Sequence, residues 1–89
     1  MRLDKFLKVS RLIKRRTIAK DISDQGRVWI NEREAKASST VKVGDALKIQ
    51  FGQKNVYVTV DQIMETTRKD AATTMYTVIK EESNKEELG

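Results

Sequence analysis

The 89-residue sequence contains no cysteine and no histidine. Disulfides, thiolate nucleophiles, zinc sites built from Cys and His, and acid–base catalysis by imidazole are therefore excluded. Proline is also absent, so one common marker of domain boundaries is missing. No run of apolar residues exceeds three, far fewer than a membrane-spanning helix needs. A chain of this length predicts one small domain.

The residues that are present form no recognisable catalytic constellation. The thirteen Asp and Glu residues are spread along the chain, and the sequence has neither a Gly-rich phosphate loop nor a cluster of metal ligands. The first residues lack the apolar segment of an export signal, and Asp4 is unfavourable in such a signal. We therefore expect a cytoplasmic protein that is not an enzyme and that uses no cofactor or metal.

The N-terminal segment is strongly basic. The first twenty residues carry about +7 of formal charge, against +5 for the whole chain. Their basic residues are Arg2, Lys5, Lys8, Arg11, Lys14, Arg15, Arg16 and Lys20. This concentration predicts a surface for a polyanion. Charge alone is compatible with nucleic acid, an anionic membrane or an acidic protein; nucleic acid is favoured because the apolar positions here suffice only for packing on a core.

Apolar residues recur at helical spacing twice in this segment, which predicts two helices. The first is expected over residues 3–9 and the second from residue 15 or 16 to Asp24. Gly26 is well placed to end the second helix in a left-handed conformation. The apolar positions that carry the pattern are Leu3, Phe6 and Leu7 in the first helix and Ile18, Ala19 and Ile22 in the second.

After Gly26 the apolar residues alternate, as they do in strands. We expect strands at 28–30, 46–51, 56–60 and 75–79, turns at 31–34 and 52–55, and a short helix at 70–74. Residues 81–89 include four Glu and are expected to form a disordered acidic tail. The predicted fold class is α+β, with two N-terminal helices packed on a small, mostly antiparallel sheet.

Three segments resemble a known RNA-binding module. Residues 2–7, R-L-D-K-F-L, resemble the R-L-D-x-x-L opening of the S4 RNA-binding domain. Residues 16–31 resemble its second helix and first strand in the spacing R-x-x-A-x-x-I-x-x-x-G-x-V-x-I-N, and residues 43–49 resemble its closing V-x-x-G-D-x-I-x-V. The resemblance covers residues 1 to about 50. It implies the S4 (alpha-L) fold, with an S4 domain at 1–65, a C-terminal extension at 66–80 and the tail at 81–89.

The chain is also similar to small stand-alone members of this family, which are related to the ribosome-associated heat-shock S4 protein. The features behind this are the size, the run at residues 51–54 and residues 75–77. The nearest resemblance is to members that act in ribosome-associated quality control in Gram-positive bacteria. It implies a factor that binds 23S rRNA and peptidyl-tRNA on an obstructed large ribosomal subunit and assists an RqcH-type protein in poly-alanine tailing. We expect this factor to be a monomer that does not bind membranes.

Other functions stay open at this point. One alternative is a general rRNA-binding heat-shock or ribosome-assembly factor with no role in tailing. Three rivals differ in class: a module that targets a separate catalytic protein, a helical DNA-binding module and a pure protein–protein adaptor.

Arg2 and Arg16 match the family's two most characteristic arginines and are the first candidates for RNA contact. Their guanidinium groups can bind phosphate bidentately, which Lys cannot do. Asp4 is expected to be structural, because a carboxylate in a first turn favours the helix N-terminus and can orient a nearby Arg. The further candidates are Lys5, Arg11, Lys14 and Arg15, and the secondary ones, which solvated surface charge explains equally well, are Lys8 and Lys20.

The beginning of the second helix departs from the family pattern. Many members have Ser or Thr just before the Arg that opens this helix, and its hydroxyl caps free N–H groups, but this chain has Arg15. Losing such a cap costs about 0.5–2 kcal/mol, and cations at this end oppose the helix dipole. Two interpretations are open: the helix begins elsewhere and these side chains are solvated, or this end of the helix faces phosphate.

Trp29 alternates with Val28 and Ile30 and therefore points away from their face of the predicted strand. An aromatic ring in this position can stack on a base. A half-exposed packing residue is the favoured interpretation.

Overall fold

The computed structural model describes residues 1–65 and 68–83. The chain begins with two helices, α1 (Leu3–Val9) and α2 (Arg16–Asp24). The strands are β1 (Val28–Ile30), β2 (Arg33–Glu34), β3 (Ala46–Phe51), β4 (Lys54–Val60) and β5 (Tyr76–Ser83). A short helix α3 (Lys69–Ala72) and a 3₁₀ turn η1 (Thr73–Met75) lead into β5. Among the described residues, no helix has the length and apolar character needed to cross a bilayer.

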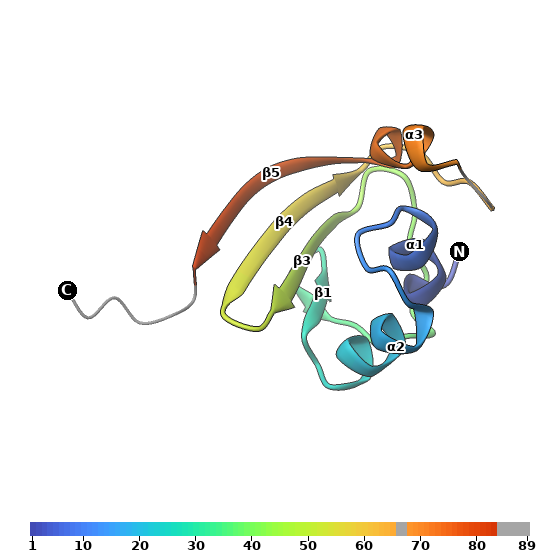
Figure 1. Cartoon of the computed structure of the whole chain (residues 1–89). Coiled ribbons are helices and arrows are strands. Elements are labelled where there is room, and N and C mark those ends of the chain that lie inside the picture. The colour runs from blue at the N-terminus through green and yellow to red at the C-terminus, as the bar shows by residue number, and fades with distance from the viewer. Residues whose placement is uncertain (66–67, 84–89) are drawn as a thin grey trace.

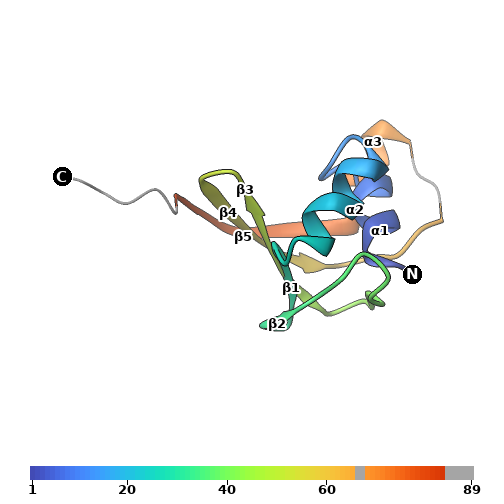
Figure 2. The same cartoon turned by 90° about the horizontal axis from the view of Figure 1, so that it is seen from below.

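The five strands form one antiparallel sheet in the order β2-β1-β3-β4-β5. Both α1 and α2 lie against the same face of this curved sheet (Figure 1, Figure 2). The predicted α+β class, with two N-terminal helices on an antiparallel sheet, is confirmed.

The core fills the space between α1, α2 and the inner face of the sheet. Alternation along the strands sends every second side chain to that face, where burial of apolar surface stabilises the fold. The fully buried large apolar residues include Leu3, Phe6 and Leu7 of α1 and Val28, Leu47, Ile49 and Val58 of the strands. Because these side chains use the inner faces of the helices, the basic residues between them are turned towards solvent.

The predicted helices have the expected bounds, and Arg16, not residue 15, is the first residue of α2. The chain reverses between them at Arg11, whose φ of 64° is left-handed. Gly26 ends α2 with a φ of 78°, as predicted. Ile18 is the exception, because its side chain is 46% exposed and only Ala19 and Ile22 of the predicted apolar positions pack inward.

Three strands differ from the prediction: β2 is additional, β4 is longer, and the strand predicted at 75–79 is β5, which begins at Tyr76 and ends at Ser83. The segment 31–34 was expected to be entirely a turn, but the turn consists of Asn31 and Glu32, both with positive φ, and β2 follows it. β4, the strand predicted at 56–60, begins at Lys54, so the hairpin between β3 and β4 is tighter than predicted. The expected helix at 70–74 is divided between α3 and η1.

The expected disordered tail is wrong for residues 81–83. These residues belong to β5, where Glu81 and Glu82 pair with Val56 and Asn55 of β4. Sequence composition predicted solvent exposure, which is correct for the side chains, but the backbone completes a ladder with β4. Residues 84–89 lie outside the described residues, and the domain boundary at residue 65 stays a prediction.

Candidate nucleic-acid interface

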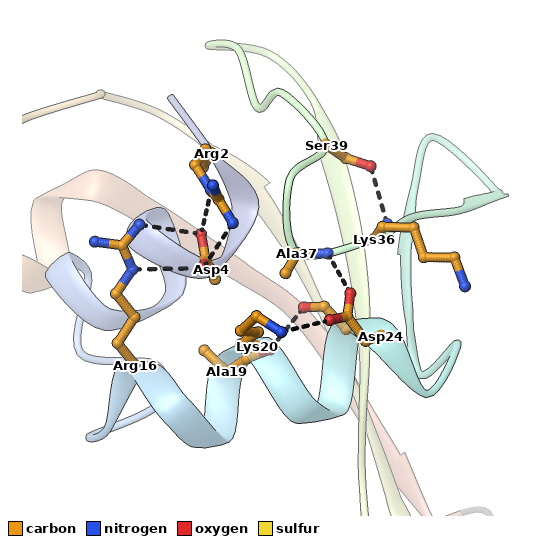
Figure 3. Close-up of polar contacts among 10 residues, drawn as sticks. Arg2, Asp4, Arg16, Ala19, Lys20, Asp24, Lys36, Ala37 and Ser39 are labelled. Atoms are coloured by element: carbon orange, nitrogen blue, oxygen red, sulfur yellow. Dashed lines mark hydrogen bonds and ion pairs between the residues drawn. The ribbon is translucent and has the colours of Figure 1, made fainter.

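Arg2 and Arg16 meet at one carboxylate, that of Asp4 (Figure 3). Arg2 donates from Nε to Asp4 Oδ1 at 3.2 Å and from Nη2 to Oδ2 at 3.4 Å. Arg16 donates from Nη2 to Oδ1 at 3.4 Å, and its Nε lies 3.4 Å from Oδ2. Arg2 is the N-cap residue of α1 and Arg16 the first residue of α2, so Asp4 ties the beginnings of both helices together. We call Arg2 and Arg16 the arginine pair.

Asp4 is almost completely buried, with a side-chain exposure of 3%. Burial alone would raise the pKa of this carboxyl, but hydrogen bonds and charge from Arg16 and Arg2 outweigh it and hold the pKa below its ordinary value of 3.8. Asp4 is therefore ionised at neutral pH, and it is structural, as expected from the sequence.

The arginine pair combines fixed position with access to solvent. The two side chains are 51% and 47% exposed, although each is anchored on the buried carboxylate. One carboxylate cannot neutralise two guanidinium groups, so the cluster keeps a net positive charge. N–H groups not used by Asp4 stay available, in the planar arrangement that suits phosphate oxygens. The geometry of the pair therefore suits an anion with several oxygen acceptors.

The beginning of α2 adds further positive potential beside the arginine pair. Arg15 is the N-cap residue, it makes no side-chain capping bond, and the first turn of α2 contains no acidic residue. The helix therefore does not begin elsewhere, so that part of the first interpretation is wrong, whereas contact of this end of the helix with phosphate stays a prediction. Lys14, Arg15 and Arg16 all have exposed side chains at the positive end of the helix dipole.

Replacing Arg15 by Ser is expected to weaken RNA binding about fivefold to tenfold while the melting temperature stays equal or rises. A serine hydroxyl can accept from the free N–H groups of the first turn, and capping is worth about 0.5–2 kcal/mol. Thermal denaturation and RNA titration of the same preparation measure both effects. Arg15→Gln is the matched control, because it removes the charge and adds no good cap. A stable variant with unchanged affinity would show that this end of the helix does not face phosphate.

The other predicted cations have different surroundings. Lys5 is half-buried and forms an ion pair with Glu65, and Lys20 pairs with Asp24 at 3.1 Å on the next turn of α2. Arg11 is exposed at the left-handed turn between the helices, and Lys8 lies in the last turn of α1, where a cation favours the helix dipole. The structure therefore brings Arg2 and Arg16 together at one shared carboxylate, whereas Lys5 and Lys20 each pair with a separate exposed carboxylate.

The loop at residues 35–40 supports the arginine pair, and no pattern in the sequence indicates this. Asp24 accepts a hydrogen bond from the Ala37 N–H at 3.0 Å (Figure 3). This bond, followed by the Lys20 ammonium, lowers the pKa of the Asp24 carboxyl. The loop in turn accepts backbone bonds from the first turn of α1, from Leu3 to the Ser39 carbonyl at 2.7 Å and from Asp4 to the Ala37 carbonyl at 3.2 Å. Since Arg2 also forms a β-bridge with Thr40, the loop fixes the backbone from which Arg2 extends.

Comparison with known proteins identifies the family of the chain. Residues 1–47 match the model of the S4 domain family. The chain is 63% identical over 82 residues to the RQC P-site tRNA stabilizing factor of Bacillus subtilis, which covers 92% of this chain and 95% of that protein. The protein of the same name from Listeria monocytogenes is 52% identical over 86 residues, which is 97% of this chain and 94% of the relative.

Among solved structures, the trimeric Vibrio cholerae heat shock protein 15 superposes with a TM-score of 0.81 and 28% identity, covering 88% of this chain and 80% of that one. The S4 match includes both helices, the 35–40 loop and the arginine pair. The chain therefore belongs to the S4 domain family and, within it, to the RQC P-site tRNA stabilizing factors.

Proposed function

We propose that this chain is a non-catalytic RNA-binding factor of bacterial ribosome-associated quality control that acts in the cytoplasm. Its arginine pair would contact RNA phosphates on an obstructed large ribosomal subunit, from 23S rRNA and from the peptidyl-tRNA in the P site. The observation that carries the proposal is the buried Asp4 carboxylate that holds two half-exposed arginines in one orientation. The names of the relatives support the P-site tRNA as one of the RNAs.

The geometry favours folded RNA over duplex DNA. The positive groups come from the beginnings of two short helices and the turn between them, and α1 spans only Leu3–Val9. Such a surface presents donors to phosphate and ribose but no long helix for a major groove. A-form RNA is recognised mainly through its shape and backbone, because its base edges lie in a deep, narrow groove. The arginine pair suits that type of recognition.

On the ribosome, the proposed role is to hold the P-site tRNA while an RqcH-type protein extends the stalled chain with alanine. The relatives' names support the first part of this role, and the sequence resemblance supports the second. A general rRNA-binding heat-shock factor is the second candidate, and the superposition on heat shock protein 15 favours it.

Sedimentation through sucrose gradients separates the two candidates. The quality-control proposal predicts enrichment on free large subunits that carry peptidyl-tRNA and little association with translating ribosomes. In the matched control, puromycin accepts the nascent peptide from the tRNA, the deacylated tRNA is washed off, and the resulting empty subunits should bind less of the protein. Equal association with all large subunits, with or without peptidyl-tRNA, would favour the general rRNA-binding factor and contradict the proposal.

A further inference from the structure

The sheet face opposite the helices has a row of alternating aromatic and basic side chains. Strand pairing places Trp29 opposite Lys48, Lys48 opposite Tyr57, and Tyr57 opposite Lys80. Directly paired residues share a face of an antiparallel sheet, so the four side chains lie side by side across β1, β3, β4 and β5. Their sequence neighbours Val28, Leu47 and Val58 are buried on the helix side. We call Trp29, Lys48, Tyr57 and Lys80 the aromatic row.

The members of the aromatic row contact one another. The Lys48 ammonium lies 4.6 Å from the centroid of the Trp29 ring and 5.8 Å from that of Tyr57. The Lys80 ammonium lies 4.8 Å from the centroid of the Tyr57 ring. Both rings are only half-buried, and no other described element lies over this face in Figure 1 or Figure 2. Trp29 is thus half-exposed, as the sequence predicted, but within residues 1–65 and 68–83 no second layer packs on its ring.

An open depression of about 500 Å³ follows the aromatic row. Besides the four members of the row, the exposed apolar side chains of Ala46 and Ile79 line it. The site is therefore a shallow, partly apolar surface between two aromatic rings. That combination suits a planar aromatic ligand, because one side of the ligand can cover a ring while its edge stays in water.

The charge of this face differs from that of the arginine pair. Glu32 lines the same depression, and Glu82 accepts from the Tyr57 hydroxyl at 2.7 Å and lies 3.8 Å from the Lys80 ammonium. The Glu82 carboxylate, by this hydrogen bond, also raises the pKa of Tyr57. Glu34 pairs directly with Trp29 across β1 and β2. Two lysines against three glutamates leave the face without net positive charge. An acidic peptide or a phosphate backbone alone would find little net attraction here, whereas a nucleobase would find two rings.

We propose that the aromatic row is a second RNA-contact surface, which stacks unpaired nucleobases. The inference rests on the proposed function and extends it from phosphate contact on the helices to base contact on the sheet. Adjacent strands are about 4.8 Å apart, so Trp29 and Tyr57 stand about 10 Å apart across β3. Each ring is then positioned for a different base of one strand, and Lys48, displaced from the rings, can contact the phosphate between them. Stacking of this kind is how single-stranded RNA is held with little dependence on sequence.

Trp29 is the chain's one tryptophan, so its fluorescence reports directly on this face. Titration of the full chain with a six-residue oligoadenylate is expected to quench the fluorescence saturably. Tyr57→Leu should weaken this binding about tenfold, since loss of one stacked ring removes a contact of that size. Tyr57→Phe keeps the ring, loses only the hydroxyl bond to Glu82, and should bind as the wild type does.

Three further measurements make the test decisive. Asp21→Asn, an exposed residue of α2 on the other side of the sheet, should show the same quenching. The affinity for the oligoadenylate should fall less with increasing salt than the affinity for folded RNA does, because the aromatic row is near neutral. A glutamate hexapeptide should not quench. Absence of quenching in the wild type, or stronger quenching by the peptide, would overturn the inference and needs no variant to be interpreted. Absent quenching with folded RNA still bound would contradict the base-stacking surface and leave the proposed function standing. Quenching by the oligoadenylate without any binding of folded RNA would support the base-stacking surface and contradict the proposed function.

Discussion

Replacing Arg2 and Arg16 together by alanine is expected to lower the affinity for structured ribosomal RNA by about two orders of magnitude. A hydrogen bond to a charged group contributes about 1.5–3 kcal/mol, so two lost guanidinium contacts remove at least about 3 kcal/mol. Filter binding or fluorescence anisotropy over a series of salt concentrations measures the effect. The wild type should show a steep dependence, up to about a thousandfold between 50 and 200 mM salt for about five phosphate contacts. The slope of log affinity against log salt should become shallower by about two in the double variant.

The matched control is Arg27→Ala/Arg33→Ala. Both residues are exposed arginines at the β1–β2 end of the sheet, so this variant loses the same net charge elsewhere. We expect the RNA affinity of this control to fall only a few fold and the slope of log affinity against log salt to stay unchanged, since the control affects only the general attraction of the protein for RNA. Equal losses in the two double variants would mean that total charge, and not the arginine pair, determines binding.

A second comparison separates contact from folding. Without either arginine, the buried Asp4 carboxylate loses its partners, so the alanine variant must be checked by circular dichroism and thermal denaturation. Arg2→Lys/Arg16→Lys keeps two cations that can reach Asp4 but lacks the planar fork that binds two oxygens at once. Its stability should stay close to that of the wild type, and its affinity should lie between those of wild type and the alanine variant. A lysine variant that bound as tightly as wild type would contradict bidentate phosphate recognition.

The helices could be predicted from the sequence because local rules determine them. The apolar spacing of Leu3, Phe6 and Leu7 defines one buried stripe, and Gly26 supplies the left-handed residue that ends α2. The candidate cations could be found in the same way, since their number in a short segment is visible without a fold. Ile18 could not be placed by this rule, because its position at the edge of the apolar stripe leaves burial to the neighbouring elements.

The supporting contacts could not be predicted because they join residues far apart in the chain. The bond between Asp24 and the Ala37 N–H depends on how α2 docks against a loop that has no periodicity of its own. β5 is a similar case: its acidic end suggests a solvated tail, yet the β4 ladder, the Lys54–Glu81 ion pair at 3.1 Å and the Tyr57–Glu82 hydrogen bond hold it as a strand. The pairing of Trp29 with Lys48 and Tyr57 depends on that register, so the aromatic row emerges only from the assembled sheet.

Asp4→Asn is expected to destabilise the protein at neutral pH and to weaken RNA binding, although it raises the net charge. The amide keeps the shape of the carboxylate and one acceptor oxygen, but it carries no charge and places an NH2 donor where the second oxygen accepted from the guanidinium groups. The free energy of unfolding should fall by about 1.5 kcal/mol. This loss is smaller than that expected for a fully buried ion pair, because both arginines are half exposed and water screens their charge. In a domain of this size it corresponds to a decrease of about 10 °C in melting temperature. Asp21→Asn, an exposed carboxylate of α2, is the matched control and should change neither property appreciably.

The pH dependence of this variant identifies the cause. In the folded chain the pKa of Asp4 is lowered from 3.8, so the carboxylate binds its proton less tightly there than in the unfolded chain. Its contribution to stability is therefore fully present above about pH 4 and is lost as the pH falls through the lower folded value. The difference in melting temperature between wild type and Asp4→Asn should accordingly be constant from pH 5 to 7 and shrink below pH 4. A difference that persisted unchanged at pH 2.5 would assign the effect to packing of the amide.

RNA binding by Asp4→Asn distinguishes positioning from charge. If affinity followed net charge alone, the variant would bind more tightly, because it removes a negative group beside two arginines. If Asp4 acts by holding the arginine pair in one orientation, the released side chains must be ordered again on binding, which costs about 0.5–1.5 kcal/mol for each. We therefore expect affinity to fall roughly tenfold at constant salt, measured well below the melting temperature. Tighter binding by Asp4→Asn would show that the carboxylate only attenuates the positive charge of the arginine pair.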